Sequence, residues 1–247
     1  MSYLILIRHG QSRWNLSNKF TGWVDVPLSR LGIREAEANA RELKNFRIDV
    51  AFTSELVRAQ ETLLIILSSQ NRTGIFLHHS EHRGRHDHYY TPMASDEIPI
   101  YSSSILNERY YGLLQGLDKA MVRQKYGEKK VMEWRRSFQG RPPGGDSLAD
   151  IYRKLIPYFK KQILPWLKKN KNVIVVAHGN TLRAMIKYLE NISDQDVAHL
   201  ELPNSQPLVY RFGAGKMRRE KGEFTFKRKV FWRAPKRKIL RHGRFKF

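Results

Sequence analysis

The sequence predicts an α/β protein of three layers (α/β/α), in which a mainly parallel central sheet lies between two layers of helices. Two observations carry this prediction. Apolar runs of strand length alternate with amphipathic helical segments along most of the chain, as expected for parallel strands joined by right-handed crossovers. The run "VIVVA" (173–177) is also wholly apolar and rich in β-branched residues, which is typical of a strand covered on both faces.

The individual elements follow from the same patterns in chain order. The sequence predicts a strand at 3–7, a helix at 28–46, a strand at 48–54, a helix at 55–69, a helix at 151–169, a strand at 172–177 and a helix at 181–190. Ser29 is a suitable N-cap for the first of these helices. Pro157 and Pro165 are expected to interrupt the helix at 151–169, because proline lacks an N–H group.

Composition limits the class of protein. The 247 residues include 41% hydrophobic residues and no cysteine, so a sizeable core is possible and disulfides are excluded. Every apolar run is far shorter than the roughly 20 residues of a membrane-spanning helix, and no secretory signal is recognisable. We therefore expect a cytoplasmic protein. The formal net charge of +22 favours anionic substrates or partners.

Two His-Gly pairs each follow a predicted strand. Arg8, His9 and Gly10 follow the first strand, and His178-Gly179-Asn180 follows a late one. Because ligands of open α/β sheets bind at the carboxyl ends of the strands, both pairs are expected at one site. Arg58 lies in the first turn of a predicted helix, where N–H groups and a guanidinium can hold phosphate. His9 is therefore a candidate nucleophile beside an anion site, whereas a metal site is disfavoured because no carboxylate lies at ligand spacing.

Five segments of the chain resemble one known family. They are "LIRHGQSRWNLSNKFTGWVDVPLSRLG" (6–32), "LNERYYGLLQGLDKA" (106–120), "WRRSF" (134–138), "VAHGNTLRAMIKYLE" (176–190) and "LPNSQPLVYRF" (202–212). Their sequences and their order resemble the histidine phosphatase superfamily, in its cofactor-dependent phosphoglycerate mutase branch. The resemblance implies a phosphoglycerate mutase-like fold and an enzyme.

The resemblance assigns catalytic roles residue by residue. The family's first histidine carries the phosphoryl group, and that role falls on His9. Arg8, Arg58 and His178 would hold the phosphoryl oxygens, since phosphoryl transfer needs positioning and charge stabilisation above all. Glu108 corresponds to the general acid/base that takes and returns the proton of a substrate hydroxyl.

The resemblance also implies a set of substrate contacts and a reaction. The contacts are Asn15, Thr21, Gly22, Arg109, Tyr111, Lys119, Arg135, Arg136, Gly179 and Asn180. The implied reaction interconverts 3-phosphoglycerate and 2-phosphoglycerate, in glycolysis and gluconeogenesis, through a phosphohistidine enzyme. The intermediate and priming phosphoryl donor is 2,3-bisphosphoglycerate, and no metal is implied.

Two features depart from the family pattern. Position 11 is Gln where mutases usually have Glu, and Gln is commoner in the phosphatase branches, so a phosphatase acting on phosphorylated small molecules is the alternative enzyme. Only "QGRPPGG" (139–145) connects two of the matched regions, where longer members carry a loop that takes part in subunit contacts. The sequence therefore leaves open whether the protein is a monomer or a homodimer.

The catalytic domain is expected at 1–213, with an insertion at about 71–104 and a basic, flexible tail at 214–247. The insertion contains His78, His79, His82, His86 and His88, and we interpret it as a solvated loop rather than a metal site. From Lys216 to the end, fourteen Lys and Arg stand against two Glu, a net charge of +12. Such a tail could attract nucleic acid or an acidic surface, so a basic scaffold on this fold is the third hypothesis.

Overall fold

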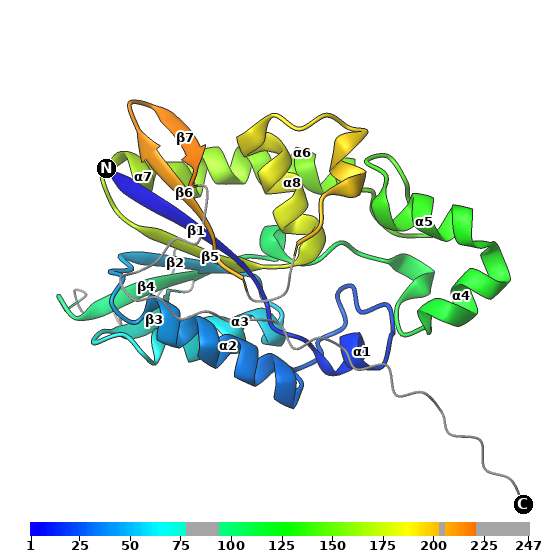
Figure 1. The fold of residues 1–247 in the computed structure, drawn as a ribbon, viewed down its shortest axis with the longest axis horizontal. Coiled ribbons are helices and arrows are strands. Elements are labelled where there is room, and N and C mark those ends of the chain that lie inside the picture. Colours follow the sequence, from blue (N-terminus) through cyan, green and yellow to red (C-terminus); the bar gives the residue numbers. More distant parts are fainter. Residues whose placement is uncertain (78–93, 203–205, 221–247) are drawn as a thin grey trace, which may run out of the picture.

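A seven-stranded sheet forms the centre of the molecule, which is a computed structural model describing residues 1–77, 94–202 and 206–220 (Figure 1). The strand order is β3-β4-β2-β5-β1-β6-β7. The strands are β1 (Ser2–Arg8), β2 (Val50–Thr53), β3 (Thr73–Leu77), β4 (Glu97–Ser102), β5 (Val173–Ala177), β6 (Leu208–Gly213) and β7 (Lys216–Arg219). The first five in this order are parallel, and β6 and β7 are antiparallel additions at one edge. The predicted, mainly parallel α/β architecture is confirmed.

Alternate residues of each central strand pack into different helix layers. Ile5 and Ile7 of β1 belong to the core cluster shared with α2 (Arg30–Leu43) and α3 (Val57–Leu67). Leu4 and Leu6 belong to the opposite cluster, shared with α6 (Leu148–Tyr158), α7 (Leu164–Lys168) and α8 (Gly179–Glu190). Because side chains point alternately to the two faces of a strand, a strand covered on both faces is apolar where it is covered, and residues 4–7 of β1 and all of β5 are apolar and buried. Figure 1 shows the sheet between these two layers.

Side-chain caps define where two of the main helices begin. The Ser29 hydroxyl accepts a hydrogen bond from the Gly32 N–H at 3.1 Å, so the predicted N-cap of α2 is confirmed. Ser147 and Asp150 form a capping box at the start of α6. Each cap satisfies backbone donors that lack a partner within the helix.

The helix predicted at 151–169 continues past its prolines. Pro157 lies inside α6, and Phe159–Ile163 forms a π-helical turn (η4) that runs directly into α7. Pro165 falls in the first turn of α7, where a missing N–H group costs little. The prolines therefore change the local hydrogen-bond spacing and do not break the segment, contrary to the sequence prediction.

Both ends of the predicted insertion at 71–104 are regular structure. Thr73–Leu77 and Glu97–Ser102 form β3 and β4, which pair in parallel with one another, and β4 pairs with β2. The expectation of an irregular excursion is therefore wrong for these residues. Its histidines lie outside the described residues. The start of the predicted tail is also regular, since Lys216–Arg219 forms β7.

Two helices extend from the main body beside the carboxyl ends of the strands. They are α4 (Lys119–Tyr126) and α5 (Glu128–Arg136), and Figure 1 shows them as an arm. A separate cluster of Phe20, Leu114, Val122, Val131 and Trp134 holds this arm against the loop before it. Within the part of the chain that the structure describes, no helix is long and apolar enough to cross a membrane.

Candidate active site

The two His-Gly pairs meet at the carboxyl ends of β1 and β5. Arg8 pairs with Ala177 in the parallel ladder, and the His9 N–H donates to the Ala177 carbonyl at 3.0 Å. His178 directly follows Ala177, the last residue of β5. The ring centroids of His9 and His178 therefore lie only 4.9 Å apart. Adjacent strand ends thus bring together residues far apart in sequence, as predicted.

His9 is held as a neutral imidazole with one defined tautomer. Its Nδ1 lies 2.6 Å from the Gly10 carbonyl oxygen. Because a carbonyl can only accept, Nδ1 carries the hydrogen and Nε2 keeps its lone pair. Burial, followed by the charges of Arg58 and Arg8, lowers the pKa of His9 well below its ordinary value. A neutral ring with a free Nε2 is the state that a nucleophilic histidine requires.

His178 is fully buried behind His9. Its Nε2 lies 2.7 Å from the Ser54 hydroxyl, which follows β2. Its Nδ1 is buried and has no hydrogen-bond partner among the described residues. Burial, then the charges of Arg58, His9 and Arg8, holds the pKa of His178 well below its ordinary value. His178 is also the N-cap residue of α8, whose first N–H groups face the same region.

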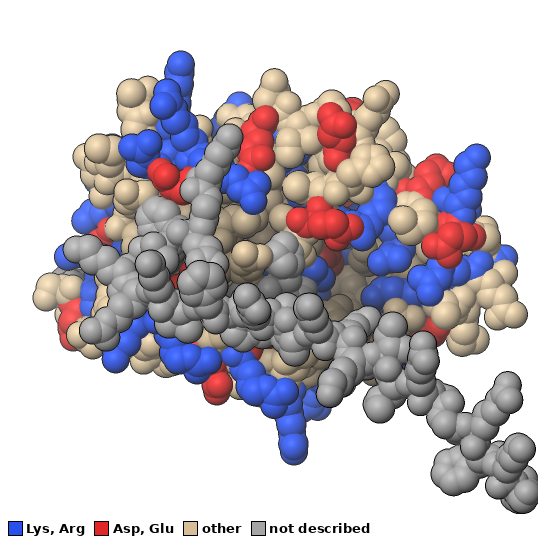
Figure 2. All heavy atoms as spheres, viewed as in Figure 1, with Lys and Arg blue, Asp and Glu red and all other residues tan. Residues whose placement is uncertain are grey.

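A pocket of about 170 Å³ opens in front of His9. Of the residues predicted for the site, it is lined by Arg8, His9, Asn15, Thr21, Gly22, Arg58, Glu108, Tyr111, Lys119, Arg135, Arg136, Gly179 and Asn180. Segments from across the chain therefore converge on one cavity. Lys and Arg outnumber Glu among its lining residues, and Figure 2 shows Lys and Arg side chains gathered beside α5. The charge of the pocket therefore favours an anionic ligand.

The remaining two predicted residues, His178 and Arg109, lie behind the lining. Arg109 is 1% exposed, and its guanidinium lies over the Tyr111 ring at 4.7 Å from the centroid. Burial acts to raise the pKa of Tyr111, but the Arg109 charge and hydrogen bonds outweigh it and lower that pKa. Arg109 therefore contacts the pocket through Tyr111.

Buried arginines supply donors to the pocket and shape its wall. Arg58 donates to the carbonyls of Gly22 at 2.7 Å and Val24 at 3.0 Å. It thereby fixes the loop that carries Thr21 and Gly22, and burial lowers the pKa of Arg58 to about 10. Buried nitrogens of Arg8 (Nε) and Arg136 (Nη1), and the Thr21 hydroxyl, have no hydrogen-bond partner within the described residues. Buried polar atoms are normally paired, so these donors favour an anionic ligand.

Glu108 faces the start of α8. Its Oε1 accepts from the Arg109 N–H at 2.7 Å and from the Asn180 side-chain amide at 2.8 Å. A carboxylate is favoured at a helix N-terminus. Glu108 therefore lines the same pocket as His9, with its Oε1 anchored by these hydrogen bonds.

Three charged lining residues were not predicted from the sequence. They are Lys19, Arg183 and Glu201. Arg183 could have been found, because it lies three residues after Asn180 and so on the same face of α8. Glu201 had no local signal, since its position depends on how 200–202 returns to α5, where Glu201 pairs with Arg136 at 2.9 Å.

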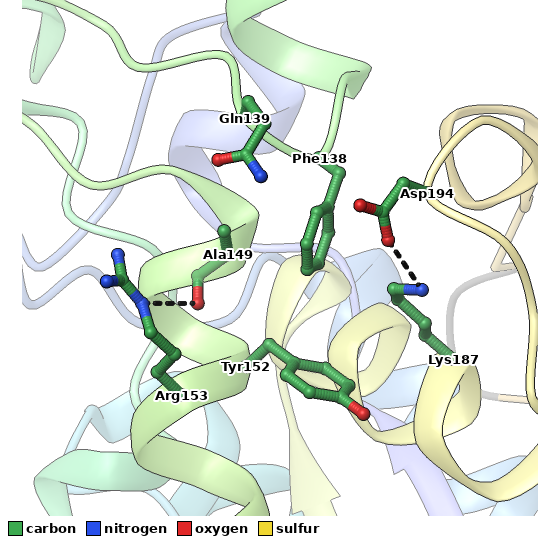
Figure 3. Close-up of a pocket in the computed structure, with 7 residues that line it drawn as sticks. All are labelled: Phe138, Gln139, Ala149, Tyr152, Arg153, Lys187 and Asp194. Atoms are coloured by element: carbon green, nitrogen blue, oxygen red, sulfur yellow. Dashed lines mark hydrogen bonds and ion pairs between the residues drawn. The ribbon is translucent and has the colours of Figure 1, made fainter.

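A second cavity, of about 430 Å³, is lined by Phe138, Gln139, Ala149, Tyr152, Arg153, Lys187 and Asp194, with Lys187 farther along α8 than the residues of the His9 pocket (Figure 3). Lys187 lies over the rings of Phe138 and Tyr152 and pairs with Asp194 at 2.8 Å. Arg153 pairs with Asp150. Because both cations already have carboxylate partners, this larger cavity lacks the free positive charge of the His9 pocket.

Comparison with known proteins agrees with this geometry. The sequence model of the family described as "histidine phosphatase superfamily (branch 1)" matches residues 4–79 and 90–221 of this chain. Solved structures share the fold: mycobacterial hydrolase 1 has a TM-score of 0.71 at 20% identity, covering 89% of this chain and 97% of that one. The alpha-ribazole phosphatase from Shigella flexneri has a TM-score of 0.68 at 19% identity, covering 88% and 94%. The chain belongs to the histidine phosphatase superfamily, branch 1.

Much closer relatives are known by sequence. The 2,3-bisphosphoglycerate-dependent phosphoglycerate mutase of Methanosarcina acetivorans is 47% identical over 239 residues, covering 90% of this chain and 96% of that protein. The protein of the same description from Gloeothece citriformis is 51% identical over 218 residues, covering 85% and 94%. The matched stretch therefore spans nearly the whole length of these relatives.

Proposed function

We propose that this chain is a 2,3-bisphosphoglycerate-dependent phosphoglycerate mutase, which interconverts 3-phosphoglycerate and 2-phosphoglycerate. The observation that carries the proposal is the pairing of a neutral His9, with Nε2 free, and Glu108 in one cationic pocket. A mutase needs both a phosphoryl carrier and a group that exchanges a proton with the substrate. Relatives of 44–51% identity share this assignment.

The chain's own residues supply each part of the reaction. A substrate hydroxyl loses its proton to Glu108 while its oxygen attacks the phosphorus carried on His9 Nε2. The new P–O bond forms as the P–N bond breaks, and the electron pair of that bond returns to Nε2. Arg8, Arg58 and the N–H groups that begin α8 stabilise the charge on the phosphoryl oxygens. The reverse sequence of bond changes re-forms phosphorylated His9.

The pocket fits a ligand with two phosphates and a carboxylate. The unpaired buried nitrogens of Arg8 and Arg136, together with Lys119 and Arg135, give the cavity several cationic donors. Burial lowers the pKa of Lys119 and of Arg135, and neighbouring cations add to this effect, so an anion between them relieves mutual repulsion. When bound, 2,3-bisphosphoglycerate supplies the phosphoryl group that primes His9.

A phosphatase is the second candidate function, and Gln11 is the residue that suggested it. The Gln11 Oε1 accepts from the Ser29 hydroxyl at 2.8 Å, and Gln11 is absent from the residues that line the described pocket. Its amide is thus used at the start of α2 and does not face the phosphoryl site. The position therefore gives little support for hydrolysis. A scaffold role would depend on the basic tail, most of which lies outside the described residues.

The phosphoryl carrier can be tested without measuring turnover. The protein is incubated with 2,3-bisphosphoglycerate and its intact mass is recorded, followed by peptide mapping under non-acidic conditions. We expect a gain of one acid-labile phosphoryl group on the peptide that contains His9, and no gain in His9→Ala. Phosphate on another residue, or none in the wild type, would contradict the proposal. The cytoplasmic location remains a prediction.

A further inference from the structure

Two residues of α8 act together on the carboxylate of Glu108, and the inference drawn from them rests on the proposed mutase reaction. The Asn180 amide nitrogen Nδ2 donates to Glu108 Oε1 at 2.8 Å and to the Tyr111 hydroxyl at 3.2 Å. Its amide oxygen Oδ1 accepts from Arg183 Nη1 at 3.3 Å. Asn180 is 4% exposed, so water does not compete freely for its amide.

Arg183 determines which way the Asn180 amide faces. A guanidinium has five donors and no acceptor, so only the amide oxygen can face it. In the opposite orientation, the amide NH₂ would face a cation and the amide oxygen would face the Glu108 carboxylate. Both of these contacts are repulsive, because like partial charges would meet in a buried setting. The arrangement therefore has one stable orientation.

Arg183 is itself fixed from the other side. Its Nε donates to the Leu200 carbonyl at 2.8 Å, which sets the plane of the guanidinium and aims Nη1 at Asn180. Arg183 has no ion pair within the described residues, so no carboxylate competes for this donor. A rigid donor with a second anchor is well suited to positioning a neighbour.

The result is a carboxylate with two unequal oxygens. Glu108 Oε1 accepts three hydrogen bonds, from the Asn180 amide, the Arg109 N–H at 2.7 Å and the Asn180 N–H at 3.4 Å. Oε2 forms no hydrogen bond within the described part of the chain and lies beside Gly179, where a Cβ atom would be 3.8 Å away. Gly179 also adjoins Arg8 and thus the phosphoryl site.

We propose that Arg183 is a positioning residue that acts through Asn180 to anchor Glu108 Oε1, leaving Oε2 as the oxygen that exchanges the proton with the substrate hydroxyl. In each transfer the substrate O–H bond breaks and an Oε2–H bond forms, with the reverse on release. Correct placement of a proton acceptor affects the chemical step more than ground-state binding. Loss of Arg183 should therefore lower kcat more than it raises KM.

A double-mutant cycle tests the coupling. Arg183→Met removes the donors while keeping the side chain's length, and Asn180→Ala removes the amide. We expect Arg183→Met to lower kcat about tenfold, equivalent to 1.36 kcal/mol, with KM changed by less than about threefold. In the Asn180→Ala background the same change should have little further effect, since coupled residues are not additive. Arg183→Lys, which keeps a donor, should recover part of kcat. Arg211 of β6 pairs with Glu220 at 2.8 Å, and Arg211→Met serves as the control.

Two further results separate this inference from the proposed function. Multiplicative effects of Arg183→Met and Asn180→Ala, or a change confined to KM, would overturn the positioning role and make Arg183 a substrate contact. If the wild type lacks mutase activity, the proposed function fails, and the amide is then followed by NMR. The Asn180 side-chain NH₂ protons should exchange slowly with solvent in the wild type and faster in Arg183→Met. Equal exchange in the two proteins would refute the inference whatever the activity.

Discussion

The Ser54 hydroxyl lies 2.7 Å from Nε2 of His178, and both side chains are completely buried. The same hydroxyl oxygen accepts the Leu56 N–H at 3.2 Å, and among the described residues Nε2 is the one acceptor within reach of its hydrogen, so the hydroxyl donates to Nε2. Nδ1 of His178 then carries the ring hydrogen and can donate to an anion held by His9. A residue outside the pocket thus sets the tautomer of His178, which adjoins His9, the proposed nucleophile.

Ser54→Ala should therefore impair catalysis without preventing folding. We expect kcat to fall about tenfold, less than the roughly 10²–10³-fold cost of removing such a donor outright, because Ser54→Ala leaves the His178 ring in place and only mixes its tautomers. Nitrogen-15 NMR of the histidine rings should show His178 changing from the Nδ1–H tautomer to a mixture. Ser68→Ala, which removes an exposed hydroxyl bonded to Ile65, is the matched control. An unchanged His178 tautomer in Ser54→Ala would contradict this account.

Gly22 is required both for its backbone conformation and for space. Its φ is +55°, and a Cβ atom there would lie 2.1 Å from Oε1 of Gln115. That oxygen accepts the Trp23 N–H at 2.7 Å, so it cannot move without losing a bond. Gly22→Ala should lower the free energy of unfolding by about 1–3 kcal/mol and raise KM by distorting the loop that Arg58 holds.

Gly127→Ala is the control that separates the effect of backbone strain from the effect of the steric clash at Gly22. Gly127 has a φ of +81° but nothing within 4 Å of a Cβ atom. Urea unfolding and KM should show a stability loss of about 1 kcal/mol for Gly127→Ala, with KM unchanged. Equal effects of the two substitutions on KM would mean that the loop at Gly22 does not position substrate.

We expect Glu201 to compete with an anionic substrate for Arg136. Its carboxylate lies 2.9 Å from Arg136 and its side chain is 75% exposed, so the pair is weak and easily exchanged. Glu201→Gln should lower KM by about two- to threefold at low salt, and the difference should shrink as salt screens the charges. KM is measured for both proteins across a salt series. A higher KM in Glu201→Gln at low salt would show that the pair supports the site rather than competing for it.

Stability should decrease in mild acid because His9 and His178 are buried in the neutral form. Burial, foremost, places both pKa values well below 6.5. Below about pH 6.5 the unfolded chain binds protons at these residues and the folded protein does not. The free energy of unfolding therefore decreases as the pH is lowered. Each residue contributes at most about 1.4 kcal/mol per pH unit. In urea unfolding between about pH 7.5 and 5.5, His178→Gln should show a shallower slope than the wild type. Equal slopes would mean that His178 takes up protons in the folded protein as it does in the unfolded chain.

Much of this structure could be predicted where the signal is local. The apolar strands β1 and β5, the Ser29 cap and the two His-Gly pairs all have short sequence signatures, and each lies where the pattern indicated. β3 and β4 were missed because "TGIFL" is partly exposed and Pro99 resembles a strand breaker. Their pairing is set by β2, from a distant segment of the chain.

The same distinction holds within the site. His9, Arg58 and Glu108 could be placed from motifs that carry them. Arg183 and Glu201 acquire their contacts from the return of residues 200–202 to α8 and α5. No pattern in that segment predicts this return, so the anchoring of Glu108 is visible only in three dimensions.

The central claim, that His9 carries a phosphoryl group between positions of one small substrate, has one most direct test. Formation of 2-phosphoglycerate from 3-phosphoglycerate is measured with and without 2,3-bisphosphoglycerate, in the wild type and in His9→Ala, while released phosphate is followed in the same reaction. We predict isomerisation that 2,3-bisphosphoglycerate stimulates, that exceeds phosphate release, and that disappears in His9→Ala. Phosphate release without isomerisation in the wild type, or isomerisation that persists in His9→Ala, would contradict the account.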